Sequence, residues 1–234
     1  MPKIAALVVA AGTGSRAGQD RPKQYVQVAG QPLLRHALLP LLAHPAIGAV
    51  RVVIGAGQED DFAHATRGLA VGAPVMGGAT RQQSVFNGLM ALAQEQGGAP
   101  EMVLIHDAAR PFLPADVIDR LLAALKQHDG AIPGLEVVDT IKQVNEHGII
   151  TATPPRPLLR AAQTPQAFRF AAIMQAHRRA ARMPEVEFSD DASVAEWAGL
   201  KVVVVKGDAR LRKITHPEDF AWAEEMTGQG GETA

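Results

Sequence analysis

Two positively charged residues accompany a glycine-rich loop near the start of the chain. The apolar run at residues 7–11 leads into Gly12-Thr13-Gly14-Ser15-Arg16, and Lys23 follows behind Pro22. Glycines let backbone N–H groups approach phosphate oxygens without a Cβ in the way, and the two cations add full positive charge beside these amides. The pattern is typical of a loop that holds a nucleoside triphosphate. A tight strand-to-helix turn with surface cations is the alternative.

The spacing of the glycines excludes two well-known phosphate loops. A P-loop requires a glycine, four residues and then Gly-Lys-Ser or Gly-Lys-Thr, and no such run follows Gly12 or Gly14. A dinucleotide loop requires Gly-x-Gly-x-x-Gly at the start of a helix, but Gly18 comes one residue too late and Pro22 interrupts the helix. The spacing therefore argues against P-loop enzymes and against nicotinamide-dependent dehydrogenases.

Polar residues that structure alone does not require occur in five further segments. These are residues 77–84, 106–111, 139–142, 156–166 and 213–219. Asp107 follows directly after an apolar run, and at the end of a strand beside a phosphate loop we expect it to bind Mg²⁺ rather than its own turn. Arg110 suits local carbonyls and phosphate equally well. His106 is more typical of a hydrogen-bonded core residue than of a proton carrier.

Other candidates have structural alternatives of their own. Arg81 and Ser84 open a predicted helix, where capping of that helix is the alternative to ligand binding. The segment Thr164-Pro165-Gln166 is more typical of a rigid turn than of a binding site. For Ser189-Asp190-Asp191 we predict a cap on the following helix.

Apolar strands alternate with amphipathic helical patterns along the chain. Strands are predicted at residues 4–10, 50–54, 102–106 and 202–205, and helices at 32–43, 59–69, 80–94, 114–128, 170–182, 190–198 and 217–226. This alternation predicts an α/β fold, with a mostly parallel, Rossmann-like sheet covered by helices on both faces. Ligands bind such a sheet at the carboxyl ends of its strands, where both Gly12 and Asp107 are expected.

Residues 136–157 break this alternation. Residues 137–144 and 149–153 have the pattern of two strands joined by Asn145-Glu146-His147-Gly148, which predicts a protruding β-hairpin arm. Because a lone hairpin is only marginally stable in water, we expect the arm to pack against a second copy of the chain in a homodimer. Thr140 and Lys142 lie on this arm, where an exposed strand face is the alternative to a binding role.

Composition is that of an ordinary globular chain. With 234 residues, 47% apolar and 20% charged, the chain is expected to form a single domain over residues 1–226, including the arm, followed by a disordered tail at 227–234.

A net charge of −1 gives no overall field for nucleic acid, and no segment approaches the roughly 20 apolar residues of a membrane span. The chain has no cysteine, which fits a cytoplasmic location. Lys3 and the apolar run after it mimic a secretion signal, but the run is short and its removal would discard the strand before the loop.

Taken together, the loop and the five polar segments resemble the 2-C-methyl-D-erythritol 4-phosphate cytidylyltransferases. Ala-Ala-Gly-x-Gly-x-Arg at residues 10–16, with Pro22-Lys23 behind it, is similar to the signature loop of nucleotidyltransferases, and the whole set matches over about residues 4–226. The resemblance implies transfer of CMP from CTP to 2-C-methyl-D-erythritol 4-phosphate, with release of pyrophosphate, in non-mevalonate isoprenoid biosynthesis. The product would be 4-diphosphocytidyl-2-C-methyl-D-erythritol.

The resemblance also implies roles for the candidate residues. Arg16 and Lys23 act as the catalytic cations, and Asp107 binds the divalent cation, Mg²⁺. The residues expected to position the acceptor are Arg110, Arg156, Lys213 and, from the neighbouring subunit, Thr140. Those expected to bind the nucleotide are Ala10, Ala11, Gly12, Thr13, Gly14, Gly78, Arg81, Ser84 and Ala108.

The reaction that the resemblance implies does not need a general base. A phosphate monoester is already anionic at neutral pH, so charge stabilisation by Mg²⁺, Arg16 and Lys23 is the main requirement. Three alternatives remain open: a cytidylyltransferase for another polyol phosphate such as ribitol 5-phosphate, a sugar-phosphate nucleotidyltransferase, and a nucleotide-sensing protein. The last class is expected to lose Asp107 and the cations, which this chain retains.

Overall fold

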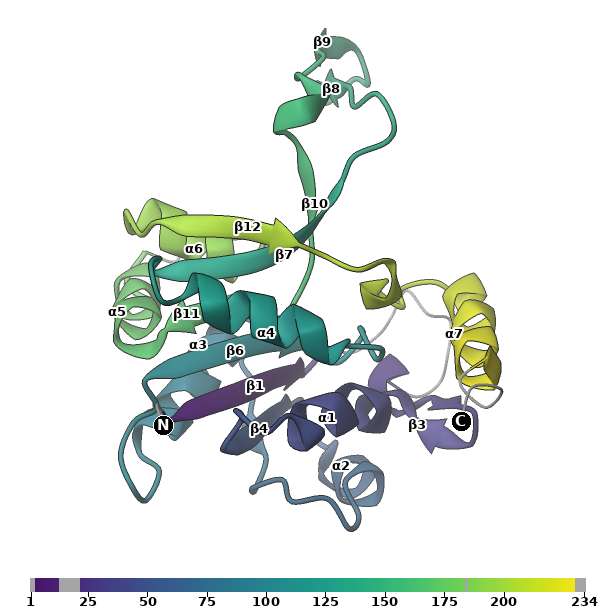
Figure 1. Cartoon of the computed structure of the whole chain (residues 1–234), viewed down its shortest axis with the longest axis vertical. Coiled ribbons are helices and arrows are strands. Elements are labelled where there is room, and N and C mark those ends of the chain that lie inside the picture. The colour runs from purple at the N-terminus through teal and green to yellow at the C-terminus, as the bar shows by residue number, and fades with distance from the viewer. Residues whose placement is uncertain (1–2, 13–21, 184, 230–234) are drawn as a thin grey trace.

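An eight-stranded sheet forms the centre of the computed structural model, which describes residues 3–12, 22–183 and 185–229. Its strands are β1 (Ile4–Ala10), β4 (Ala49–Ile54), β5 (Val75–Met76), β6 (Met102–Asp107), β7 (Gly130–Glu136), β10 (Arg160–Ala162), β11 (Gln166–Arg169) and β12 (Val202–Lys206). Seven of them follow one another in the order β10-β7-β11-β6-β1-β4-β5, and β12 stands outside this order and pairs with β7. Figure 1 shows the sheet with most of these strands labelled.

The strands that border the glycine loop are parallel. β1 runs parallel to both β4 and β6, and β5 continues the parallel set beyond β4. β12 is parallel to β7, whereas β10 and β11 are antiparallel to their neighbours. The predicted mostly parallel, Rossmann-like sheet is confirmed, with an antiparallel insertion that the sequence pattern did not indicate.

Helices cover both faces of this sheet (Figure 1). They are α1 (Leu33–Ala43), α2 (Glu59–Ala65), α3 (Arg81–Ala93), α4 (Ala115–Ala124), α5 (Phe170–Ala180), α6 (Asp191–Trp197) and α7 (Pro217–Gln229). Each predicted helix is confirmed, with differences at the ends. Because α7 continues to Gln229, the predicted disordered tail is wrong for residues 227–229, and residues 230–234 lie outside the described residues. None of the helices in the described part of the chain is long and apolar enough to cross a membrane.

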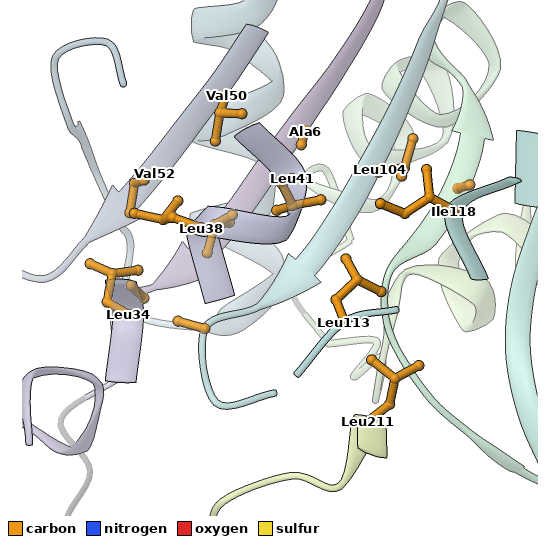
Figure 2. Close-up of a cluster of buried hydrophobic side chains, with 14 of the residues drawn as sticks. Ala6, Leu34, Leu38, Leu41, Val50, Val52, Leu104, Leu113, Ile118 and Leu211 are labelled. Carbon is orange, nitrogen blue, oxygen red and sulfur yellow. The ribbon is translucent and has the colours of Figure 1, made fainter. Parts of the chain in front are cut away.

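Alternation along β1 divides the core into two layers. Ile4, Ala6 and Val8 point into a cluster with α1 and α4, which Figure 2 shows around Leu34, Leu38 and Ile118. Ala5 and Leu7 point to the opposite face and pack with residues of α3, α5 and α6. Successive strand residues face opposite sides of a sheet, so a strand covered on both faces must be apolar throughout. Burial of one Leu or Val side chain stabilises the folded state by about 1.5–3 kcal/mol. Burial on both faces therefore stabilises β1 in the interior of the sheet.

The arm projects away from the sheet between β7 and β10 (Figure 1). Its tip is a small hairpin of β8 (Gln143–Val144) and β9 (Ile150–Ala152). Asn145 Oδ1 accepts hydrogen bonds from the backbone N–H groups of His147 and Ile149, and Gly148 has a φ of +75°. The predicted hairpin and its turn are therefore confirmed, but the strands are shorter than predicted and Thr140 precedes β8 in irregular backbone.

A small cluster under α7 supports the segment that carries Lys213. Val28, Leu33, Ile214 and Ala223 are buried together, beside the short strands β2 (Gln27–Val28) and β3 (Gln31–Pro32). Asp219 Oδ2 accepts the backbone N–H groups of Thr215 and His216 at 2.8 and 2.9 Å. These contacts hold the chain directly after Lys213 against α7.

Candidate functional site

A cavity of about 830 Å³ lies at the carboxyl ends of β1, β4 and β6. The register pairs Val9 of β1 with Asp107 of β6, and the N–H of Ala108 donates to the carbonyl of Val9. The predicted position of Asp107 and Gly12 at this edge is therefore confirmed. Predicted site residues that line the cavity are Ala10, Ala11, Gly12, Lys23, Gly78, Arg81, Ser84, Asp107, Ala108 and Lys213.

Asp107 lies among cations at this edge. Its Oδ2 accepts a hydrogen bond from Lys213 Nζ at 2.7 Å, and its Oδ1 accepts from Arg81 Nη2 at 3.2 Å and Nε at 3.3 Å. Its backbone N–H donates to Thr164 Oγ1 at 3.1 Å. Burial alone would raise the pKa of Asp107, but Arg81 and Lys213 outweigh it and hold the pKa well below its usual range. Asp107 is therefore a carboxylate at neutral pH.

The described part of the glycine loop is held by Gln24. Its Nε2 donates to the carbonyls of Ala10 and Gly12 at 2.6 and 2.9 Å, which fixes the chain as it leaves β1. Sequence reasoning missed this residue, although it lies beside Lys23 and is buried. Thr13, Gly14 and Arg16 lie outside the described residues.

Lys23 connects two segments that are far apart in the sequence. Its Nζ donates to the carbonyl of Ile214 at 2.9 Å, directly after Lys213. The N–H of Ile214 in turn donates to the carbonyl of Ala109 at 2.8 Å, which brings Lys213 to Asp107. Two cations that are far apart in the sequence therefore line one wall of the cavity.

The loop at Gly77 and Gly78 forms the opposite wall. A Cβ on Gly77 would lie 2.6 Å from Ala11 Cβ and 2.9 Å from Ser84 Oγ, so only glycine allows this close approach. Ser84 Oγ accepts from the N–H of Gly78 and donates to the carbonyl of Thr80, both within 3.1 Å. The capping alternative for Arg81 and Ser84 is wrong, because Thr80 caps α3 by accepting the N–H of Gln83.

The segments at His106 and residues 164–166 have structural roles. His106 is fully buried, with Nδ1 3.0 Å from Thr164 Oγ1 and Nε2 2.9 Å from the carbonyl of Arg110. Burial lowers the pKa of His106 to about 4, so the imidazole is neutral at pH 7. Gln166 binds Asp190 and the N–H of Ala192. The core interpretation of His106 is confirmed, whereas the predicted turn is limited to a bend at Thr164 and Pro165 because Gln166 is the first residue of β11.

The cap predicted at residues 189–191 is formed by Asp190. Asp190 Oδ1 accepts the N–H of Ser193 and completes a capping box at the start of α6. The next residue, Asp191, differs from this prediction. Its Oδ2 accepts from Arg81 Nη2 at 2.8 Å, so it is buried behind the cavity wall as the partner of a lining residue and does not form the cap.

Three predicted acceptor residues lie outside the cavity lining. Arg110 Nη1 donates to the carbonyl of Leu211, which agrees with the predicted alternative of a contact to local carbonyls. Its Nε has no hydrogen-bond partner among the described residues. Arg156 lies in a 3-10 helix of the arm, where its Nη1 donates to the carbonyl of Val138. Thr140 is exposed on the same arm. Within one chain, the structure does not bring Thr140 and Arg156 to Lys213.

The donor set fits a metal ion that arrives with phosphate oxygens. In the described ranges, no group of three or more Asp, Glu or His side chains could hold a metal, and Asp107 is the only carboxylate in the cavity lining. Mg²⁺ is commonly held by one or two carboxylates together with substrate phosphates and water. Asp107 therefore fits such an ion, whereas a cage made of protein ligands alone does not fit.

Comparisons with known proteins identify similar chains. A family model described as 2-C-methyl-D-erythritol 4-phosphate cytidylyltransferase, IspD, matches residues 4–229. The bifunctional enzyme IspD/IspF of Rhodopseudomonas palustris strain HaA2 is 51% identical over 95% of this chain and 55% of its own length, so this chain spans about half of that relative.

Solved structures agree with these matches along the chain. The 2-C-methyl-D-erythritol 4-phosphate cytidylyltransferase of Thermus thermophilus is 34% identical with a TM-score of 0.78, and the alignment covers 97% of this chain and 99% of that one. The 4-diphosphocytidyl-2C-methyl-D-erythritol synthase of Anaerococcus prevotii is 27% identical with a TM-score of 0.84 and the same coverage.

Proposed function

Because the chain belongs to the 2-C-methyl-D-erythritol 4-phosphate cytidylyltransferase family, we propose that it transfers CMP from CTP to 2-C-methyl-D-erythritol 4-phosphate. The products are 4-diphosphocytidyl-2-C-methyl-D-erythritol and pyrophosphate, in non-mevalonate isoprenoid biosynthesis. The observation that carries this proposal is the cavity in which Asp107, Lys23 and Lys213 meet opposite the wall of Gly78 and Ser84. The cysteine-free composition supports a cytoplasmic location.

The reaction is an in-line displacement at the α-phosphorus of CTP. An oxygen of the acceptor's phosphate monoester forms the new P–O bond, and the bond to pyrophosphate breaks. With a second pKa near 6, the monoester is anionic at neutral pH and needs no base. The neutral, buried His106 is therefore not required as a proton acceptor.

Charge stabilisation is then the main task of the protein. Lys23 neutralises charge on the α-phosphate and the leaving group, together with Arg16 of the glycine loop. Lys213 holds the acceptor's phosphate. Asp107 would hold Mg²⁺ when CTP binds, and the ion would supply Lewis-acid stabilisation of the phosphate oxygens.

The nucleotide lies between the glycine loop and the opposite wall. Ala11, Gly78 and Ser84 are small residues of the cavity lining, so they leave room for a base beside them. The Ser84 hydroxyl donates to Thr80 and accepts from Gly78, so it holds this wall in place beside the base.

A single assay tests this function. CTP and Mg²⁺ are incubated with the protein and a panel of polyol phosphates, and pyrophosphate release is measured. We expect release with 2-C-methyl-D-erythritol 4-phosphate and at least tenfold less with other nucleoside triphosphates. Faster release with ribitol 5-phosphate would instead support the alternative acceptor.

We also propose that the arm forms a homodimer and completes the site of the partner. Val138 and Leu158 on the arm are about 80% exposed, an unusual state for large apolar side chains in a protein that acts alone. Thr140 and Arg156 lie on the same arm, away from the cavity of their own chain. A partner's cavity is a place where both could meet an acceptor.

Mixed dimers test this shared site. We expect Lys23→Ala and Thr140→Ala each to lower activity, and co-expression of the two to restore up to about half of the wild-type rate per heterodimer, because both substitutions fall in one site and leave the other intact. The rates of purified heterodimers, identified by mass, decide the question.

The matched control is a dimer that combines Lys23→Ala with Asp107→Asn. Both substitutions lie in the cavity, so every site of that dimer carries one of them and no recovery is expected. If the Lys23→Ala and Thr140→Ala heterodimer is no more active than its parents, Thr140 acts within its own chain.

A further inference from the structure

Asp191 is a buried carboxylate that the proposed reaction does not use directly. It is the first residue of α6 and only 1% exposed, and α6 packs against α5, which in turn packs against α3. A buried carboxylate requires a cation or hydrogen-bond donors, because burial strongly disfavours an unpaired charge.

Arg81 is the cation that satisfies Asp191. Arg81 Nη2 lies 2.8 Å from Asp191 Oδ2. His177 Nε2 lies 3.3 Å from Asp191 Oδ1, but among the described residues that oxygen has no hydrogen-bond partner. Burial would raise the pKa of Asp191, but Arg81 and His177 together outweigh it and keep the pKa low. Asp191 therefore stays charged, and Arg81 is the cation that makes its shortest contact.

Asp107 depends on Arg81 much less. The same Nη2 lies 3.2 Å from Asp107 Oδ1, and Asp107 also has Lys213 Nζ at 2.7 Å. The guanidinium is thus shared unequally between two carboxylates, with the shorter contact to the more buried one.

The position of Arg81 makes this sharing relevant to ligands. Its side chain is 27% exposed and lines both the 830 Å³ cavity and a neighbouring cavity of about 530 Å³ beside Phe86 and Phe188. A cation in this wall makes the electrostatic potential at Asp107 more positive. Paired with Asp191, it contributes little net charge there, whereas an unpaired guanidinium would repel a divalent cation.

We propose that Asp191 is a positioning residue that anchors Arg81 in the cavity wall and offsets its charge, which keeps Asp107 available to a divalent cation arriving with the nucleotide. The inference rests on the proposed function only for the identity of the nucleotide, CTP. It assigns a role to Asp191 beyond the cap of α6.

Asp191→Asn tests the inference without an activity measurement. Calorimetric titration gives the Kd of CTP in EDTA and again with saturating Mg²⁺. The Kd in EDTA divided by the Kd with Mg²⁺ measures how strongly the metal assists binding. We expect the variant to bind metal-free CTP at least as tightly as wild type and CTP with Mg²⁺ more weakly. The ratio should fall about tenfold, the size expected for one uncompensated unit charge near the metal ligand.

Asp190→Asn is the matched control. It changes the neighbouring carboxylate, which caps α6 and does not contact Arg81, and asparagine is an equally good cap. We expect its ratio to equal that of wild type. The double variant Arg81→Gln with Asp191→Asn removes one charge of each sign. Its ratio should return to within about threefold of wild type even though the loss of Arg81 weakens CTP binding itself.

The outcomes separate this inference from a purely structural role. A structural role predicts equal weakening with and without Mg²⁺, so an unchanged ratio in Asp191→Asn overturns the inference. Should that variant fail to fold, Arg81→Gln alone must raise the ratio, because it leaves the charge of Asp191 uncompensated. Failure of the proposed function is distinct: wild type would then not bind CTP or would release no pyrophosphate.

Discussion

Asp107→Asn is expected to lower turnover by about 10²–10³ and to remove the response of the remaining rate to Mg²⁺. Asparagine keeps the shape of the side chain and the backbone N–H that donates to Thr164, so the end of β6 stays in place. It removes the charge that we expect to bind the metal and that Arg81 and Lys213 neutralise. Turnover measured across a Mg²⁺ titration checks this expectation.

Asp116→Asn provides the control for this substitution. Asp116 is an exposed residue of α4 that pairs with Arg120, outside the cavity lining. It should leave both turnover and the Mg²⁺ response unchanged. A Mg²⁺ dependence in Asp107→Asn equal to that of wild type would show that Asp107 is not the metal ligand.

Lys23→Ala is expected to reduce turnover by about 10² or more, the cost of one oriented charge beside the reacting phosphate. CTP binding should weaken less, because the charge contributes most when negative charge is redistributed in the transition state. Separate measurement of kcat and of the Kd of CTP distinguishes the two effects.

A structural contribution of Lys23 must be measured alongside. Its Nζ donates to the carbonyl of Ile214, so the thermal unfolding of the variant should be compared with that of wild type. Lys201→Ala, which changes an exposed lysine outside the cavity lining, is the matched control and should keep wild-type turnover. Near-normal turnover with only a raised KM would show that Lys23 binds substrate and does not stabilise the transition state.

The sequence was sufficient for the parts of the fold with strong periodicity. β1 is apolar on both faces and α3 has a regular apolar stripe, so both were predicted to within a residue or so of their ends. β7 was missed because Gly130, Pro133 and Gly134 interrupt its apolar run. Its place in the sheet depends on pairing with β12, a contact that no local pattern reveals.

The site was predictable where chemistry follows directly after a strand. Asp107 and Gly12 could be placed at one edge because parallel strands end together. The pairing of Arg81 with Asp191 could not, since these residues are distant in sequence and meet only because α5 packs against both α3 and α6. Local spacing left capping open as the alternative role of Ser84, whereas the structure uses Thr80 for the cap and leaves Ser84 in the cavity lining.

The contact between Lys23 and the segment at Ile214 has a consequence for the order of events during synthesis. The ribosome releases the chain from its N-terminus at about 5–20 residues per second, so β1, β4 and β6 emerge and can pair well before Lys213. Until then, Asp107 has Arg81 but lacks the closer of its two hydrogen-bonded cations. The pocket around Asp107 therefore lacks one of its two hydrogen-bonded cations until Lys213 has left the ribosome, so we expect competence for catalysis to arise only after that point.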